Sequence, residues 1–293
     1  MKIAIFGAGN IGAAVANDLI VSDSLSEKVD SIALVDAVER IASGKALDLA
    51  HAAAVYERDL RISASTEPSD IADAGIVVIT AGHARKAGQS REELFGVNAV
   101  IVAQCARDAA KYAPSSIIIV VTNPLDMMVY AALQASGFTK ERVIGMAGEL
   151  DGARLKFELA RASGKEISSM RSAIVGPHSE EMIALKNELG FEISDEIFER
   201  AVQNTKRAGA QIGELLGTSA YLAPAAGIVK IIKYILFDTC GTLACCVADR
   251  SGVPLGRFVS VGKMGAIERN FAYSGEFYAQ LERMRASVEN LKF

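Results

Sequence analysis

Apolar positions in the first half of the chain follow two alternating patterns. Short runs of consecutive apolar residues, typical of strands buried on both faces, alternate with longer segments in which apolar residues recur at helical spacing. The runs that predict strands are Lys2–Phe6, Ile32–Val35, Ile76–Thr80, Ile117–Thr122 and Arg142–Ile144. The segments that predict helices are Ile11–Ile20, Ile41–Ala53, Arg91–Lys111 and Leu125–Ala135. This alternation predicts an α/β fold with a doubly wound parallel sheet.

The alternation changes after about residue 145. The later segments with helical spacing are Glu149–Arg161, Asp195–Leu216 and Ala225–Leu236, and the later strand-like runs are Arg171–Val175, Leu243–Ala248 and Arg257–Val261. They predict a mixed α+β domain. We therefore expect two domains, covering residues 1–145 and 146–293.

The whole-chain composition is that of an ordinary soluble globular protein. Of the 293 residues, 51% are hydrophobic and 23% are charged, and the net charge is −4, which argues against disorder and against nucleic acid as a partner. The apolar runs are strand-sized, so no membrane contact is expected. The first strand begins at Lys2, and the four cysteines lack the spacing of metal ligands or disulfides. We expect a cytoplasmic protein without a signal peptide, with reduced thiols and no metal site.

One segment departs from the acidic net charge. Between His83 and Arg91 the chain carries Arg85 and Lys86 and no acidic residue. A basic loop in an acidic chain suggests a small anionic ligand.

A glycine-rich motif directly follows the first predicted strand. The strand runs into Gly7-Ala8-Gly9-Asn10-Ile11-Gly12, where a helix is predicted to begin. Gly7 permits the tight turn, Gly9 lets the backbone approach a pyrophosphate, and Gly12 lets the helix pack against the strand. The helix N-terminus faces the phosphate charge. The motif predicts an N-terminal Rossmann domain that binds a dinucleotide.

The second predicted strand ends next to Asp36. A carboxylate at this place accepts hydrogen bonds from the ribose hydroxyls and repels a 2′-phosphate, so the expected cofactor is NAD rather than NADP. Two alternatives stay open on these residues alone. The Rossmann domain could bind FAD or a methyl donor, and Asp36 could be only a strand-end cap.

Further motifs occur in a fixed order along the chain. They are the segment from Thr80 to Arg91 with Leu94 and Asn98, Val121-Thr122-Asn123-Pro124-Leu125-Asp126, Leu150-Asp151-Gly152-Ala153-Arg154, Gly176-Pro177-His178, the segment from Ser219 to Ala225, and Gly252-Val253-Pro254-Leu255-Gly256. Together they resemble the lactate/malate dehydrogenase family over nearly the whole chain. Within it, they are most similar to the lactate-dehydrogenase-like malate dehydrogenases of bacteria and archaea.

The resemblance implies a chemical role for each matching position. His178 is the expected general base, Asp151 orients its ring, and Arg154 binds the substrate carboxylate through its planar fork. Arg91 is expected to polarise the reacting carbonyl, and Arg85 to bind the second carboxylate of a dicarboxylate substrate. Asn123 is expected to contact both substrate and nicotinamide. The remaining cofactor-binding positions implied by the family are Thr80, Ala81, Gly82, Asn98 and Val121. The family habit also implies a homodimer or homotetramer.

Each of these residue types also has a plainer interpretation. An Asp–Arg pair at helical spacing is often a surface salt bridge, and Arg85 and Lys86 could be solvated loop charges. Among the three histidines, His83 competes with His178 for the catalytic role, because it lies in the loop on the cofactor side. His51 is expected to be a packed or surface residue.

The chain departs from the family pattern directly after His178. Ser179-Glu180 replaces the usual Gly-Asp, and the segment between Leu236 and Gly252 is short for the family. The favoured function is reversible NAD-dependent oxidation of malate to oxaloacetate. The alternatives are a lactate-type 2-hydroxy acid dehydrogenase, distinguished by Arg85, and a non-catalytic NAD-binding relative, supported only by Ser179-Glu180.

Overall fold

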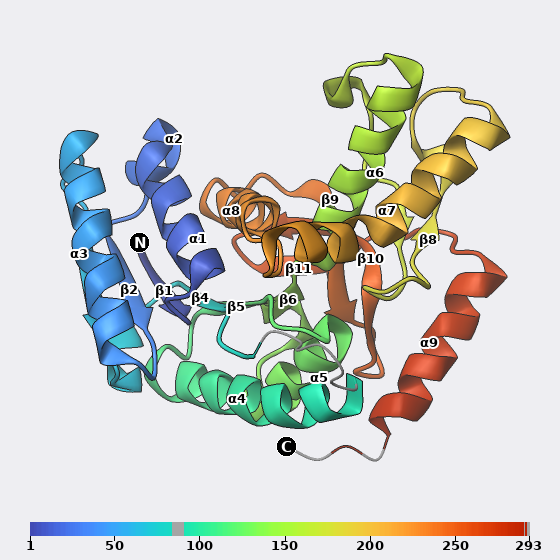
Figure 1. Ribbon diagram of the computed structural model, residues 1–293. Coiled ribbons are helices and arrows are strands. Elements are labelled where there is room, and N and C mark those ends of the chain that lie inside the picture. Colours follow the sequence, from blue (N-terminus) through green and yellow to red (C-terminus); the bar gives the residue numbers. More distant parts are fainter. Residues whose placement is uncertain (84–90, 290, 292–293) are drawn as a thin grey trace.

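The computed structural model describes residues 1–83, 91–289 and 291. Within these residues nine strands form one sheet, in the order β11-β10-β9-β6-β5-β4-β1-β2-β3. Strands β1 to β6 pair in parallel, and their order β3-β2-β1-β4-β5-β6 is that of a Rossmann sheet. The predicted α/β architecture is confirmed (Figure 1).

The bounds of the elements are as follows. The strands are β1 Lys2–Phe6, β2 Ser31–Val35, β3 Arg61–Ser65, β4 Ile76–Ile79, β5 Ile117–Val120, β6 Val143–Gly145, β7 Ile174–Val175, β8 Ile183–Ala184, β9 Gly241–Ala248, β10 Pro254–Gly262 and β11 Gly265–Glu268. The α-helices are α1 Asn10–Val21, α2 Asp23–Ser26, α3 Glu39–Val55, α4 Arg91–Tyr112, α5 Leu125–Ser136, α6 Ala147–Ser163, α7 Asp195–Leu216, α8 Leu222–Leu236 and α9 Gly275–Val288. Short 3-10 helices are η1 Pro68–Ile71, η2 Lys140–Arg142, η3 Ile167–Ser169 and η4 Lys186–Glu188.

Helices cover both faces of the sheet. On one face α1, α3 and α8 pack their apolar sides against the strands, and on the other face α4 and α5 do so (Figure 1). Helix α8 comes from the C-terminal half and contacts α1 from the N-terminal half. The two halves therefore share one hydrophobic core, which fixes the elements of both halves that surround the site. No helix among the described residues is long and apolar enough to span a membrane.

Three strands and two α-helices, the four-residue α2 and the longer α9, were absent from the sequence expectation. Strand β3 lies at the sheet edge, with two of its five residues exposed and none fully buried, so it lacks the continuous apolar run of its neighbours. Strands β8 and β11 have only two and four residues. Helix α9 does carry a sequence signal, because the Ser274 hydroxyl accepts a hydrogen bond from the Phe277 N–H as an N-cap.

The C-terminal strands also extend the Rossmann sheet. Strand β9 pairs antiparallel with β6 at Gly145 and Cys246, and β10 and β11 continue outward from β9. The division at residues 145 and 146 stays a prediction, and the sheet runs across it.

Candidate active site

The glycine motif forms the turn that the sequence predicted. Gly7 has a φ of 99°, and a Cβ on Gly12 would lie 2.0 Å from the Gly7 carbonyl oxygen, so a side chain at Gly12 would push α1 away from β1. Gly9 instead faces open space and lines a cavity with Asn10 and Ile11. The loop therefore leaves room for a phosphate group beside the N-terminus of α1.

Asp36 is tied to this loop. Its carboxylate accepts the Ala8 N–H at 2.8 Å and the Val38 N–H at 2.9 Å. A carboxylate has about four acceptor positions, so two remain for ribose hydroxyls. The residue therefore caps the strand end and also fits the adenosine side of NAD.

Asn98 holds two cofactor-side loops together. It is fully buried, and its amide accepts the His83 N–H at 2.8 Å and donates to the carbonyl oxygens of His83 and Asn123 at 3.1 and 2.7 Å. Its side chain does not line the cavity. Any contribution of Asn98 to cofactor binding is therefore through the positions of His83 and Asn123.

His178, Asp151 and Arg154 meet in one group. His178 follows β7, whereas Asp151 and Arg154 lie on the same face of α6. The Nδ1 atom of His178 lies 2.7 Å from Oδ2 of Asp151, and Nη1 of Arg154 lies 3.3 Å from Oδ1. Their side chains are 19%, 2% and 16% exposed, respectively. The pair predicted from helical spacing is thus a sheltered group and not a surface salt bridge.

The surroundings shift the titration of His178. Burial alone lowers the pKa of its imidazole, but the charge of Asp151 and the hydrogen bond to it raise that pKa, and the net result is a pKa above the ordinary value. Because the Asp151 carboxylate accepts from Nδ1–H, the proton that can be exchanged with a substrate is the one on Nε2. Such a shifted, oriented imidazole is suited to proton transfer near neutral pH.

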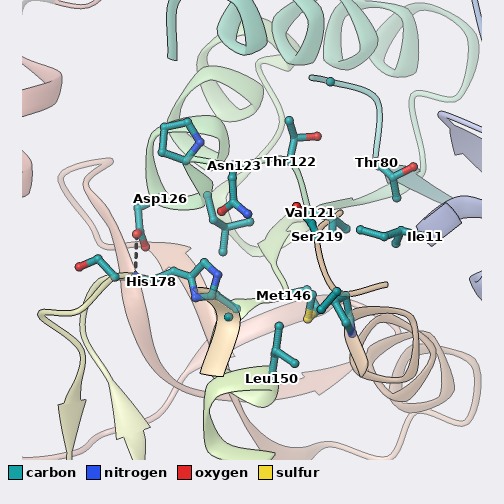
Figure 2. A pocket seen from close by; sticks show the side chains of 18 of the residues that line it. Ile11, Thr80, Val121, Thr122, Asn123, Asp126, Met146, Leu150, His178 and Ser219 are labelled. Atoms are coloured by element: carbon teal, nitrogen blue, oxygen red, sulfur yellow. Dashed lines mark hydrogen bonds between the residues drawn. The ribbon is translucent and has the colours of Figure 1, made fainter. Parts of the chain in front are cut away.

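A cavity of about 680 Å³ joins the glycine loop to this group. Figure 2 shows the side chains of Asn123 and His178 in the same part of the cavity, with Ile11 and Thr80 farther along it. The predicted residues that line it are Gly9, Asn10, Ile11, Thr80, Gly82, Val121, Asn123, Arg154 and His178. Gly7, Gly12, Asp36, Ala81, Asn98 and Asp151 are absent from this lining. Arg85 lies outside the described residues, and Arg91 begins α4 with its side chain outside the description.

The other two histidines differ in their places. His83 lines the cavity, and its side chain is exposed, whereas His51 lies exposed on α3.

The two residues that depart from the family pattern after His178 also lie in different places. Ser179 lines the cavity and its hydroxyl accepts the Glu181 N–H at 3.1 Å, whereas Glu180 is exposed and does not line it.

Several lining residues were missed as site residues by sequence reasoning. They are Thr122, Asp126, Met146, Leu150, Ser179, Glu181, Thr218, Ser219, Ala220 and Tyr221. Ser219 to Tyr221 belong to a motif that was recognised only as a family segment. Asp126 closes the Asn-Pro motif, and this position was the available signal for it.

Comparisons with known proteins extend over both halves. Residues 1–145 match the lactate/malate dehydrogenase NAD binding domain, and residues 148–292 match the lactate/malate dehydrogenase alpha/beta C-terminal domain. The malate dehydrogenase of Nitratiruptor sp. is 40% identical over 280 residues, which cover 91% of this chain and 87% of that protein.

Solved structures agree with this assignment. The malate dehydrogenase from Aeropyrum pernix superposes with a TM-score of 0.92 at 31% identity, covering 99% of this chain and 98% of that one. The malate dehydrogenase from Plasmodium falciparum in complex with NADH gives 0.88 at 29% identity, covering 99% and 96%. A Cryptosporidium parvum lactate dehydrogenase complexed with lactic acid and nicotinamide adenine dinucleotide gives 0.88 at 27% identity, covering 98% and 95%. The chain, with its NAD-binding Rossmann half and its His–Asp–Arg group, belongs to the lactate/malate dehydrogenase family.

Proposed function

We propose that this chain catalyses the reversible NAD-dependent oxidation of (S)-malate to oxaloacetate. The observation that carries the proposal is the His178–Asp151–Arg154 group, which shares one cavity with the glycine loop. The malate dehydrogenases among the relatives support malate as the substrate.

The residues divide the chemistry between them. The glycine loop at Gly9, Asn10 and Ile11 would hold NAD, which would supply the acceptor for the C2 hydride of malate and, in its reduced form, the donor for the reverse reaction. His178 takes up the C2 hydroxyl proton at Nε2, and Asp151 stabilises the imidazolium that results. In the reverse direction, His178 gives this proton to the carbonyl oxygen of oxaloacetate. Arg154 holds the C1 carboxylate, and Asn123 orients the substrate at the end of β5.

Two further roles rest on the sequence resemblance. Arg91 is proposed to polarise the C2 oxygen, and Arg85 to pair with the C4 carboxylate. A closed site cannot hold that second carboxylate without a cation, because an unpaired buried charge is costly. Arg85 also discriminates against pyruvate, because its own charge would then be enclosed without a partner.

The substrate assignment is tested by the ratio of two activities. We expect kcat/KM for oxaloacetate to exceed kcat/KM for pyruvate by at least about a hundredfold, the effect of one charge pair of about 3 kcal/mol. Arg85→Gln should lose most oxaloacetate activity and gain relative activity on pyruvate. Lys86→Gln removes a neighbouring charge from the same basic loop and should leave the ratio unchanged. An unmodified enzyme that prefers pyruvate would make the lactate-type alternative correct.

The pH dependence of the two directions should be opposite. Reduction of oxaloacetate needs protonated His178, so its kcat/KM should fall as pH rises through the raised pKa of His178. Malate oxidation needs neutral His178 and should increase over the same range. Asp151→Asn removes the charge that raises this pKa, and should therefore move the alkaline decline of the reduction to lower pH. Profiles of kcat/KM against pH measure both effects, and an unmoved decline in Asp151→Asn would contradict the role of Asp151.

A cytoplasmic location and a homo-oligomeric assembly are part of the proposal. Cys105, Cys240, Cys245 and Cys246 are free thiols, which is typical of a reducing compartment such as the cytoplasm. A homodimer or homotetramer is proposed from the family resemblance. Light scattering coupled to size-exclusion chromatography measures the assembly directly.

A further inference from the structure

A second buried carboxyl lies beside His178. Asp126 is in the first turn of α5, two residues after Pro124, and it is 6% exposed. Its Oδ2 accepts the main-chain N–H of His178 at 2.9 Å (Figure 2). Helix α5 follows the Rossmann strand β5, whereas His178 follows β7 in the C-terminal half. This hydrogen bond therefore connects the cofactor side of the cavity to the proposed proton donor.

The main chain just before His178 is also fixed by hydrogen bonds. Gly176 exchanges two backbone hydrogen bonds with Gly256 of β10, at 2.8 and 3.1 Å. With Gly176 fixed to the sheet and the His178 N–H fixed to Asp126, the short segment between them has little freedom. The ring of His178 is then fixed at its Nδ1 atom by Asp151. His178 is thus held by carboxylates from two different helices, at its main-chain N–H by Asp126 of α5 and at its imidazole by Asp151 of α6.

Burial of Asp126 is costly, which indicates that the residue has a specific use. Burial raises the pKa of its carboxyl, although the His178 N–H and the nearby Cys246 thiol act to lower that pKa. Within the described part of the chain, its Oδ1 atom has no hydrogen-bond partner. An acidic side chain with one unsatisfied oxygen stabilises a fold less well than an apolar residue of the same size. The hydrogen bond to the His178 N–H is an interaction that an apolar residue could not replace.

We propose that Asp126 is a positioning residue, which places the His178 imidazole for proton transfer by accepting the His178 main-chain N–H. The proposal rests on the proposed role of His178 as proton donor and acceptor. Asp126 lines the cavity, but the role assigned to it acts through His178 and needs no contact with substrate. Its effect should therefore be on turnover and only weakly on the binding of NADH.

Asparagine and leucine form a matched pair for the test. Both are neutral and close to aspartate in size, and only asparagine offers an oxygen to the His178 N–H. Asn also replaces the Oδ1 atom, which has no partner among the described residues. The pair therefore separates the hydrogen bond from both the charge and the shape of the side chain.

The experiment compares kcat for 2-oxo acid reduction and Kd for NADH in Asp126→Asn and Asp126→Leu. We expect Asp126→Leu to lower kcat by about tenfold to a hundredfold, because a displacement of about 1 Å in a catalytic group has an effect of this size. Its Kd for NADH should stay within about twofold, and Asp126→Asn should keep kcat within about threefold of the unmodified enzyme. If Asp126→Leu does not fold, Asp126→Ala replaces it in the same comparison.

A control separates positioning from general loss of packing. Met128 is fully buried on the same helix and does not line the cavity, so Met128→Ala should lower the Tm while kcat of the folded enzyme is unchanged. Equal kcat losses in Asp126→Asn and Asp126→Leu would overturn the proposal, as would unchanged kcat in both or a matching loss of NADH affinity. The substrate is whichever 2-oxo acid the unmodified enzyme reduces best. If the unmodified enzyme reduces another 2-oxo acid but not oxaloacetate, the proposed substrate is wrong. The comparison of the Asp126 variants is then made with that other substrate and remains valid.

Discussion

Replacing His178 by asparagine is expected to lower kcat for oxaloacetate reduction by about a hundredfold to ten-thousandfold, the usual contribution of a general acid or base. Asparagine is polar and can still contact Asp151, but its amide does not gain or lose a proton near neutral pH and so cannot exchange one with the substrate oxygen. Because the glycine loop and Asp36 are remote from this change, the Kd for NADH should remain near its unmodified value. Steady-state loss of NADH absorbance gives kcat, and a titration of NADH fluorescence gives the Kd.

His83 provides the matched control for this experiment. It lines the same cavity, but its described hydrogen bonds to Asn98 are made by its main chain. His83→Ala should therefore change kcat by less than about threefold, whereas His178→Asn loses nearly all of it. The reverse pattern would exchange the roles of the two histidines. An unmodified enzyme without turnover on any 2-oxo acid would favour the non-catalytic relative.

The fold could be predicted where burial requires a regular pattern of apolar residues in the sequence. Strands β1, β4 and β5 are covered on both faces by helices and read as unbroken apolar runs. Strand β3 has one neighbour and half-exposed side chains, so its sequence is not distinct from that of a loop. The pairing of β9 with β6, which joins the two halves of the chain, could not be predicted either. The register between two strands that are distant in sequence produces no periodic pattern in either strand.

The site shows the same division. His178, Asp151 and Arg154 were predicted to lie together because their side chains have the chemistry that the proposed reaction needs and occur in recognisable motifs, and the structure brings them together. Asp126 was missed, and the loop contacts of Asn98 were not foreseen, because their partners are main-chain groups of residues far away in sequence. The cofactor-binding role of Asn98 stays a prediction. A main-chain N–H or carbonyl is present at nearly every position, so such a contact imposes no residue type on the partner and leaves no pattern to read.

Removal of Arg154 should have the largest effect on substrate binding. We expect Arg154→Leu to lower kcat/KM for oxaloacetate by about a thousandfold, since truncating one side of a sheltered charge pair costs about 2 to 5 kcal/mol. The loss should appear mainly as a raised KM, because the C1 carboxylate is held before and during the reaction alike. Arg154→Lys should recover only part of the activity, because an ammonium group lacks the planar fork that binds both carboxylate oxygens.

The change at Arg154 also affects its neighbour. The positive charge of Arg154 lowers the pKa of His178, so its removal raises that pKa and keeps the imidazole protonated to higher pH. Oxaloacetate reduction needs the protonated form. A loss of reduction activity in Arg154→Leu is therefore not caused by the change in the pKa of His178. Arg161→Leu is the matched control, since Arg161 lies on the same helix, is 66% exposed, and contacts Glu158 and the ring of Phe157 rather than the catalytic group. It should leave kcat/KM unchanged. Equal losses in the two variants would show that α6 had been damaged, and an unchanged KM in Arg154→Leu would place the substrate carboxylate elsewhere.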